Sequence, residues 1–402
     1  MIQHKKIWIS VILILAFGLR LYQSLLGVPL SSNIWSDMRG YVQLADWILQ
    51  NNWNENHFFQ SIGFPYLIAF LKSQTTDWGL ALSLINNALS FFTVILMWKS
   101  AEATFGERIG FYSLVIGAFH VPWILLNIYA MPETAFGFLL AVCCFSSIKI
   151  LAGHRVALYS LLWGSSFIIG FWLKGTHAFL GPLFYIGLYL SKRKTSLIPI
   201  LLIGIPVVIG LGLHAWLSSA KIGKVQLSAS AGGLNFVEGK CPAKKNRDNA
   251  GYSWQSALYY QLHLDTEKSW DRPFTDSSYY FQEGLNCIKK DPFVLIQSLE
   301  GISFLVYGNT TWPLNQRKDA GAIRLYEHIF TVFLIFGLVF FIRQSWSSFK
   351  LDEFFIWSFP ILAIFITTYI FKSEMRFRIP FDVWFIPVAL KGWSLSLQYR
   401  RP

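Results

Sequence analysis

SLIPILLIGIPVVIGLGLHAWL, residues Ser196–Leu217, contains no Asp, Glu, Lys or Arg. An apolar helix of about 20 residues is long enough to cross the ~30 Å hydrocarbon core of a bilayer. Similar stretches recur along the whole chain, which is 54% hydrophobic and only 14% charged, whereas soluble proteins carry about 25% charged residues. These features exclude a soluble domain and predict an all-α polytopic membrane protein: an enzyme, a carrier or a channel.

We expect about ten transmembrane helices with extracytoplasmic loops between them. The first, about Ile7–Gly27, follows His4-Lys5-Lys6 and has no small-residue cleavage site, which favours a retained anchor over a signal peptide. The break at Lys174-Gly175 is compatible with a hairpin or with a bent segment. The other predicted spans lie near Leu80–Trp98, Gly110–Leu126, Thr134–Leu151, Val156–Leu173, Thr176–Leu190, Ser196–Leu217, Tyr326–Ile342, Glu353–Phe371 and Ile379–Leu397.

Lys and Arg in short connections set the orientation of such a protein. With the N-terminus inside, the cytoplasmic connections collect most of these cations, and the net charge of +12 comes largely from them. The basic character is therefore a topology signal, and nucleic acid is not an expected partner. The predicted organisation is an N-terminal transmembrane module 1–217 with a catalytic first outer loop 28–79, a long extracytoplasmic loop 218–325, and C-terminal transmembrane helices 326–402.

The four cysteines fall into two pairs with different environments. Cys241 and Cys287 lie in the long outer loop, where an oxidising compartment permits a disulfide. We favour this bridge over two free thiols. Cys143 and Cys144 lie within a predicted span and are interpreted as packing residues.

Asp37 follows the first span closely, so we expect it near the outer surface of the membrane. If this stretch is helical, Asp37, Tyr41 and Ala45 share one face. A carboxylate in that place can act as a general base toward a hydroxyl or an amine. Taken alone, however, an ordinary solvated Asp or a helix N-cap is the simpler interpretation.

Glu133 and Lys174 are two further ionisable groups expected at the outer surface. Glu133 lies in the short outer turn Pro132-Glu133-Thr134. Ionisable groups at a membrane are functional candidates by default, yet an acid at a helix N-terminus is equally explained by the macrodipole. Lys174 can reach a phosphate or simply snorkel to lipid headgroups.

The segment Lys372–Pro380 concentrates three cations and one acid on the outer side, against the positive-inside trend. Guanidinium groups bind phosphate bidentately, so Arg376 and Arg378 are predicted to hold a lipid-linked phosphate. The alternative is an anchor for anionic headgroups. Weaker candidates for substrate binding are Arg39, Tyr41, His57, Gln60, Asn235 and Glu374.

Several motifs together resemble one superfamily. The first outer loop has an acid followed by Tyr and Ala, and then Gly63-Phe64-Pro65-Tyr66; later come Pro132-Glu133-Thr134, Gly232-Gly233-Leu234-Asn235-Phe236 and Glu374-Met375-Arg376-Phe377-Arg378-Ile379-Pro380. Their order and spacing resemble the dolichyl-phosphate-mannose–protein mannosyltransferase and aminoarabinose transferase superfamily. The resemblance covers nearly the whole chain and implies a type C glycosyltransferase fold.

The resemblance also implies a reaction. Such enzymes move a sugar from a polyprenyl-phosphate carrier to a lipid, glycan or protein acceptor on the outer face. Asp37 would be the base, Glu133 would shape the acceptor site or, in some relatives, a metal site, and Arg376 and Arg378 with Lys174 would hold the carrier phosphate. Many relatives carry a second acid where this chain has Met38, so we propose no metal and no other cofactor.

The chain is expected to lack a large carboxy-terminal soluble domain, so the long outer loop would supply acceptor recognition. Its aromatic rings suit stacking on sugars, although they are at least as well explained as a small amphipathic core lying on the membrane. These rings are Tyr252, Trp254, Tyr259, Tyr260, Trp270, Tyr279 and Tyr280.

Two other functional classes stay open. A ligase or polymerase of cell-surface polysaccharide also uses a lipid carrier and outer cations, but it has no special need of Asp37. A flippase or transporter usually shows internal repeats or paired broken helices, and the sequence shows neither clearly. For all three classes we expect a bacterial cytoplasmic membrane, contact with membrane lipids and a site on the extracytoplasmic side. No residue specifies the donor sugar.

Overall fold

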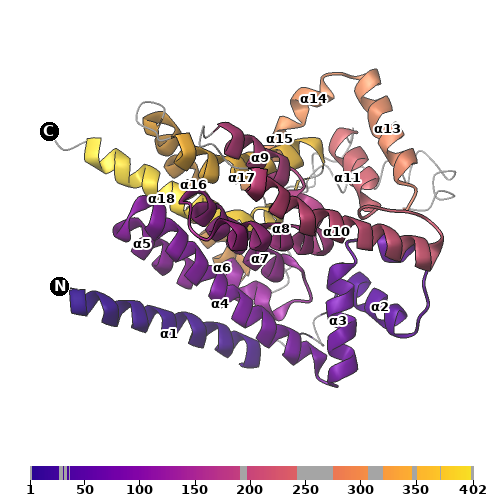
Figure 1. The fold of residues 1–402 in the computed structure, drawn as a ribbon, viewed down its shortest axis with the longest axis horizontal. Coiled ribbons are helices and arrows are strands. Elements are labelled where there is room, and N and C mark those ends of the chain that lie inside the picture. Colours follow the sequence, from indigo (N-terminus) through magenta and orange to yellow (C-terminus); the bar gives the residue numbers. More distant parts are fainter. Residues whose placement is uncertain are drawn as a thin grey trace.

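The computed structural model describes residues 2–26, 30, 34–35, 37–190, 197–241, 275–306, 320–345, 351–371 and 373–399. Within these ranges every regular element is a helix. Figure 1 shows the N- and C-termini at one end of a helical bundle. At the other end lie α2 (Asp37–Leu49), α3 (Gly63–Gln74), α11 (Ala231–Lys240) and α13 (Ser277–Lys290).

Most helices of the bundle are long and apolar. Six helices of the described chain are long and apolar enough to cross a membrane, and a seventh crossing results if the bent pair α5 and α6 is one span. The bundle helices are α1 (Ile2–Leu26), α4 (Trp78–Phe105), α5 (Glu107–Ala118), α6 (Val121–Leu125), α7 (Glu133–Leu151), α8 (Val156–Leu173), α9 (Leu180–Leu190), α10 (Leu197–Ile222), α16 (Ala320–Ser345), α17 (Leu351–Ile370) and α18 (Asp382–Tyr399). The protein is thus an integral membrane protein.

Every predicted span lies on helices of this bundle, but within the described residues fewer of them qualify as full crossings than the ten expected. α8 begins and ends at the predicted residues. α9 has only 11 residues, because the chain after Lys174 first forms the 3-10 turn η4 (Gly175–His177). In α17, residues Phe354–Ile370 form a shorter apolar helix.

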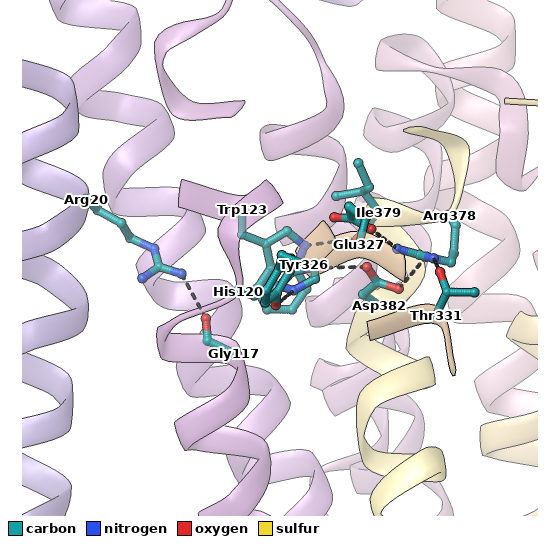
Figure 2. Close-up of polar contacts among 10 residues, drawn as sticks. All are labelled: Arg20, Gly117, His120, Trp123, Tyr326, Glu327, Thr331, Arg378, Ile379 and Asp382. Atoms are coloured by element: carbon teal, nitrogen blue, oxygen red, sulfur yellow. Dashed lines mark hydrogen bonds and ion pairs between the residues drawn. The ribbon is translucent and has the colours of Figure 1, made fainter. Parts of the chain in front are cut away.

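At the break between α5 and α6, an arginine side chain is buried among the bundle helices. The two helices are bent by 48°, and a helix that ends inside a bundle leaves carbonyl groups without partners. Buried Arg20 of α1 donates to Ala118 O at 2.8 Å and to Gly117 O at 3.0 Å. Its Nε donates to Ser90 Oγ at 2.9 Å. Arg20 therefore caps the broken helix, as Figure 2 shows for Gly117.

Small residues allow the closest helix contacts in the bundle. A Cβ placed on Gly392 of α18 would collide with Gly337 O of α16, and one on Gly164 of α8 would collide with Ile203 O of α10. Glycines at such crossings let helix backbones approach closely in a membrane. These contacts bring α18 close to α16 and α8 close to α10.

The outer helices are tied to one another by backbone contacts and one disulfide. Ser230 N and Ala231 N donate to Phe58 O at 2.8 Å and Phe59 O at 2.9 Å, which joins the segment after α10 to the first outer loop. Cys241 and Cys287 form a disulfide with a Cα–Cα distance of 5.4 Å, as favoured from the sequence. It links α11 to α13.

Other expectations for this region are only partly covered by the described residues. Cys143 and Cys144 are free and buried, in keeping with a packing role. Tyr279 and Tyr280 of α13 pack edge to face with ring centroids 5.3 Å apart. The remaining aromatic residues proposed for sugar stacking lie outside the described residues: Tyr252, Trp254, Tyr259, Tyr260 and Trp270.

Candidate active site

Asp37 and Arg376 meet at the end of the bundle that lies opposite the two termini (Figure 1) and was predicted to be the outer one. Asp37 lies in the first turn of α2, and its side chain is 36% exposed. Arg376 belongs to η7 (Met375–Phe377), just before α18, and its Nη2 lies 2.9 Å from Asp37 Oδ2. Arg376 Nε forms a second ion pair with Glu374 Oε2. Arg376 therefore contacts Asp37, from a motif at the other end of the chain, and Glu374, from its own motif.

Glu133 and Lys174 form a second ion pair. Glu133 is the first residue of α7 and is 1% exposed, while Lys174 follows the last residue of α8. Lys174 Nζ donates to Glu133 Oε1 at 2.6 Å and lies 4.5 Å from the centre of the Phe377 ring. Phe377 also lies 5.6 Å from the Arg376 guanidinium carbon. The Phe377 ring thus joins the two ion pairs into one site, which we call the outer cluster: Asp37, Glu133, Lys174, Glu374, Arg376 and Phe377.

Tyr41 lies one helical turn after Asp37, on the same face of α2, as the spacing predicted. Its ring packs edge to face on Phe64, with centroids 5.3 Å apart. Burial, reinforced by the negative charges of Asp37 and Glu133, raises the pKa of Tyr41 well above its usual value. The phenol therefore keeps its proton and can donate a hydrogen bond within the outer cluster.

The motif that begins at Gly63 has a steric explanation. A Cβ on Gly63 would lie 2.7 Å from Trp172 O, near the end of α8. Only glycine allows α3 to approach the α8 backbone so closely. Lys174 lies two residues after Trp172 in the chain. The close contact at Gly63 therefore brings the first outer loop against the outer cluster.

Charges within the outer cluster are nearly balanced, with three carboxylates and two cations. Burial alone would lower the pKa of Arg376, but Glu374 and Asp37 outweigh it and the pKa is raised. Burial lowers the pKa of Lys174, and Glu133 opposes this shift. Arg376 is therefore a permanent cation held between carboxylates, whereas Lys174 is a partly desolvated one.

Arg378 does not join Arg376 in the outer cluster, contrary to the shared phosphate site that their spacing predicted. Its side chain is fully buried, and its Nη2 donates to Glu327 Oε2 of α16 at 3.0 Å. Its Nε lies 3.1 Å from Asp382 Oδ1 of α18, and Figure 2 shows both contacts. Arg378 lies between two 3-10 helices, η7 and η8 (Ile379–Phe381), and side chains two residues apart in such a segment point in different directions. Arg376 therefore faces Asp37, whereas Arg378 faces the bundle.

The remaining predicted residues are spread around the first outer loop and α11. Arg39 is exposed on α2. His57 is buried against the rings of Trp53 and Trp47 and caps η2 (Glu55–Phe58) through Asn54, which is a structural role. Burial lowers the pKa of His57.

Gln60 and Asn235 have no role that the contacts reveal. Gln60 Oε1 is buried without a hydrogen-bond partner among the described residues, and it would lie 3.7 Å from a Cβ on Gly40 of α2. Asn235 is half-buried on α11. On the same helix, Gly233 N donates to Ser277 Oγ at 3.0 Å, so the double glycine packs α11 against the start of α13.

An open, polar cleft of about 550 Å³ adjoins this outer region. One wall is Glu55 of η2, which pairs with Lys224 and accepts a hydrogen bond from Thr275 Oγ1 at 3.2 Å. The pair with Lys224 lowers the pKa of Glu55. The rest of the lining consists of residues 226–230 and 276–278, which are rich in serine. Hydroxyl, amide and carboxylate groups thus converge on one space.

The donor set does not fit a metal ion. Within the described part of the chain no three His, Cys, Asp or Glu side chains come close enough together to hold one. Arg376 forms ion pairs with Asp37 and Glu374, and Lys174 forms one with Glu133. Protein cations therefore already neutralise these carboxylates, and no step is assigned to a metal.

Several buried polar residues were not predicted as candidates, although His120, Tyr326 and Asp382 could have been found as ionisable or polar residues within predicted apolar spans. Beneath the outer cluster, His120 Nε2 lies 3.0 Å from Asp382 Oδ2, and His120 Nδ1 lies 2.9 Å from Tyr326 Oη. Figure 2 shows this group beside Arg378. Near the disulfide, buried Lys240 donates to Ser298 Oγ at 2.8 Å.

No family model and no curated protein matches this chain. Among solved structures, it is similar to the archaeal oligosaccharyltransferase AglB from Archaeoglobus fulgidus, determined in complex with an inhibitory peptide and a dolichol-phosphate. The TM-score is 0.51 at 10% sequence identity, over 98% of this chain and 51% of that chain. The chain thus spans about half the length of AglB. Likeness at this identity concerns the fold alone, and the fold is that of a type C glycosyltransferase, as the motifs predicted.

Proposed function

We propose that this protein is a membrane glycosyltransferase that moves a sugar from a polyprenyl-phosphate-linked donor to an acceptor on the extracytoplasmic face of a bacterial cytoplasmic membrane. The observation that carries the proposal is the 2.9 Å contact between Asp37 and Arg376, which come from opposite ends of the chain. Transfer from a phosphate carrier needs a base for the nucleophile and a cation for the leaving group. The dolichol-phosphate bound to AglB supports a lipid carrier for this fold.

The reaction is a displacement at the anomeric carbon of the donor sugar. The acceptor hydroxyl or amine attacks this carbon as its proton passes to Asp37, and the bond from the carbon to the phosphate oxygen breaks. The polyprenyl phosphate leaves with the bonding electron pair, so negative charge develops on its oxygen. Arg376 is placed to neutralise that charge, and Tyr41 is a hydrogen-bond donor beside it.

Arg376 exchanges partners in this scheme. In the structure its guanidinium is bound by Asp37 and Glu374. A carrier phosphate competes for the same donors, and its binding would free Asp37 to face the acceptor. Lys174 adds a second positive charge while it stays paired with Glu133. Arg378 is excluded from the phosphate clamp in this proposal, because Glu327 and Asp382 already use its donors.

The polar cleft beside Glu55 is our candidate for acceptor binding. Its volume of about 550 Å³ is large enough for a polar group of a glycan, lipid or protein. Serine hydroxyls and a carboxylate suit hydrogen bonding to hydroxyl-rich acceptors. Ser230 of its lining donates a hydrogen bond to Phe58 O of the loop that also carries Asp37, which supports this assignment.

The experiment is sugar transfer by purified protein in nanodiscs. A panel of radiolabelled polyprenyl-phosphate sugars is offered together with a crude cell-envelope acceptor fraction. We expect Asp37→Asn to lower kcat by about 10²–10⁴-fold, the usual contribution of a general base. Arg376→Gln is expected to raise the KM for the donor, because the guanidinium contacts the phosphate of the bound donor in this scheme. It is also expected to lower kcat, because the same group neutralises the phosphate as it leaves.

Two matched controls separate chemistry from folding. Asp46→Asn changes another carboxylate of α2, one that pairs with Lys72, and Arg108→Gln removes a cation near the start of α5. Both should keep nearly full activity. Full activity of Asp37→Asn would place the base elsewhere, with Glu133 the next candidate. If wild type consumes no donor, the ligase or flippase interpretation takes precedence, and a transport assay without any acceptor distinguishes between them.

A further inference from the structure

Beneath the outer cluster, five buried or partly buried polar residues are connected in one chain of contacts. Tyr326 and Glu327 come from α16, His120 from the break before α6, Asp382 from the start of α18, and Arg378 from the segment before it. We call them the buried relay. Figure 2 shows their side chains converging between these elements. None of them is used by the chemistry proposed above.

The contacts fix which atom donates in the relay. A carboxylate can only accept, so His120 Nε2 carries a proton and donates it to Asp382 Oδ2, at 3.0 Å, whether the ring is neutral or charged. In the neutral ring, Nδ1 then accepts from the Tyr326 hydroxyl at 2.9 Å. The other oxygen, Asp382 Oδ1, lies 3.1 Å from Arg378 Nε. Each oxygen of Asp382 therefore has its own partner.

The relay acts on the segment that carries Arg376. Arg378 is anchored inside the bundle by Asp382 and Glu327, and the next residue, Ile379, accepts a hydrogen bond from Trp123 Nε1 at 3.0 Å. Two consecutive residues are thus held from the inner side. Arg376, two residues earlier in the same segment, then points away from these inner contacts and toward Asp37.

We propose that His120, Tyr326, Glu327 and Asp382 are positioning residues that hold Arg378 and thereby aim Arg376 at the outer cluster. Removal of one buried partner leaves the others with unmatched charge or hydrogen bonds in a medium without water. The Arg378 side chain can then leave its place, and the segment 373–381 loosens. A residue that fixes a catalytic cation in this way affects the rate without touching substrate.

The test compares His120→Ala with His120→Gln by hydrogen–deuterium exchange of the protein in nanodiscs. The amide nitrogen of Gln reaches about as far as Nε2 and can still donate to Asp382, whereas Ala cannot. We expect His120→Ala to raise exchange at least tenfold in peptides covering 373–381, and His120→Gln to stay within about twofold of wild type. Tyr326→Phe, which removes only the proton donor to Nδ1, should give a smaller rise in the same peptides.

His214→Ala is the matched control. His214 is also buried, but it contacts the backbone carbonyl of Gln226, at 2.8 Å, rather than a carboxylate. It should leave 373–381 unchanged. Unchanged exchange of this segment in both His120→Ala and Tyr326→Phe would overturn the proposal, and so would an equal rise in all helices, which indicates general destabilisation.

A kinetic measurement extends the test and rests on the proposed function. His120→Ala should lower kcat for sugar transfer at least tenfold with little change in the KM for the acceptor, and His120→Gln should restore it. A wild-type protein without transfer activity would refute the proposed function, yet the exchange data would still decide the positioning role. An active His120→Ala protein with a loosened segment would refute the link to Arg376.

Discussion

Replacement of Lys174 by Met is expected to destabilise the protein strongly, because it leaves a buried carboxylate without its cation. Lys174 Nζ and Glu133 Oε1 are 2.6 Å apart, and Glu133 is 1% exposed. The second carboxylate oxygen, Oε2, has no hydrogen-bond partner within the described chain. Breaking a buried ion pair from one side costs about 3–5 kcal/mol. We therefore expect that loss of stability for Lys174→Met.

The expected shift in melting temperature follows from the size of the protein. The entropy of unfolding is about 2.1 cal/mol/K per residue. For a chain of 402 residues, each loss of about 0.8 kcal/mol in the free energy of unfolding therefore lowers Tm by about 1 °C. The loss expected for Lys174→Met should lower Tm by about 4–6 °C. Glu133→Gln should cost less, about 1–3 kcal/mol, because Lys174 is 13% exposed and can turn toward solvent. The double variant should recover most of the stability, since no unpaired charge remains.

The assay is thermal unfolding in one detergent, monitored by tryptophan fluorescence. It compares wild type, Lys174→Met, Glu133→Gln, the double variant and one control. Lys72→Met is the control: its partner Asp46 is just as close, at 2.6 Å, but is 45% exposed, so the loss should stay below about 1 kcal/mol. The reasoning is refuted if Lys174→Met and Lys72→Met shift Tm equally. It is also refuted if the effects of the two single changes simply add in the double variant.

Three further changes test other parts of the structure. Cys241→Ser with Cys287→Ser should lower Tm by the equivalent of about 2–4 kcal/mol, and dithiothreitol should then have no additional effect on the variant. Arg20→Met should lower Tm more than Arg20→Lys, because Lys can still donate to the carbonyls at the end of α5; equal losses would contradict its capping role. Burial lowers the pKa of Lys240 to about 8, from an ordinary value of 10.5. The unfolded chain therefore binds more protons between these values, and wild-type stability should rise with pH from about 8 to 10.5. In Lys240→Met that rise should be reduced in melting curves recorded across this range.

Much of the fold could be predicted because its signal is local. Apolar runs such as Val156–Leu173 gave helix bounds that the structure reproduces. The signal weakens where a span is short or broken: η4 interrupts the stretch before α9, and the 48° bend divides α5 from α6. A hydropathy pattern measures how apolar a segment is, but it does not show where buried hydrogen bonds such as those of Arg20 permit a helix to break.

The candidate site could be predicted as a set of residues but not as a set of pairs. Asp37, Glu133, Lys174, Glu374 and Arg376 were each identified from charge near a predicted membrane surface, and the structure brings them together. Their proposed roles in catalysis and phosphate binding stay predictions. His57 was predicted as a polar candidate in the first outer loop, near the same surface, and it is buried against the rings of Trp47 and Trp53.

By itself, then, the sequence determined that this chain is an integral membrane protein and which segments are helical, and it predicted which charges lie near the membrane surface. These properties follow from the composition and periodicity of adjacent residues. Only the tertiary structure decided that Arg376 meets Asp37 while Arg378 meets Glu327 and Asp382. Both arginines have the same chemistry and lie two residues apart, so their partners depend on which helices pack on each side of the segment. Asp37 and Glu327, which distinguish the two sides, lie far from both arginines in the chain, so local sequence does not specify this choice.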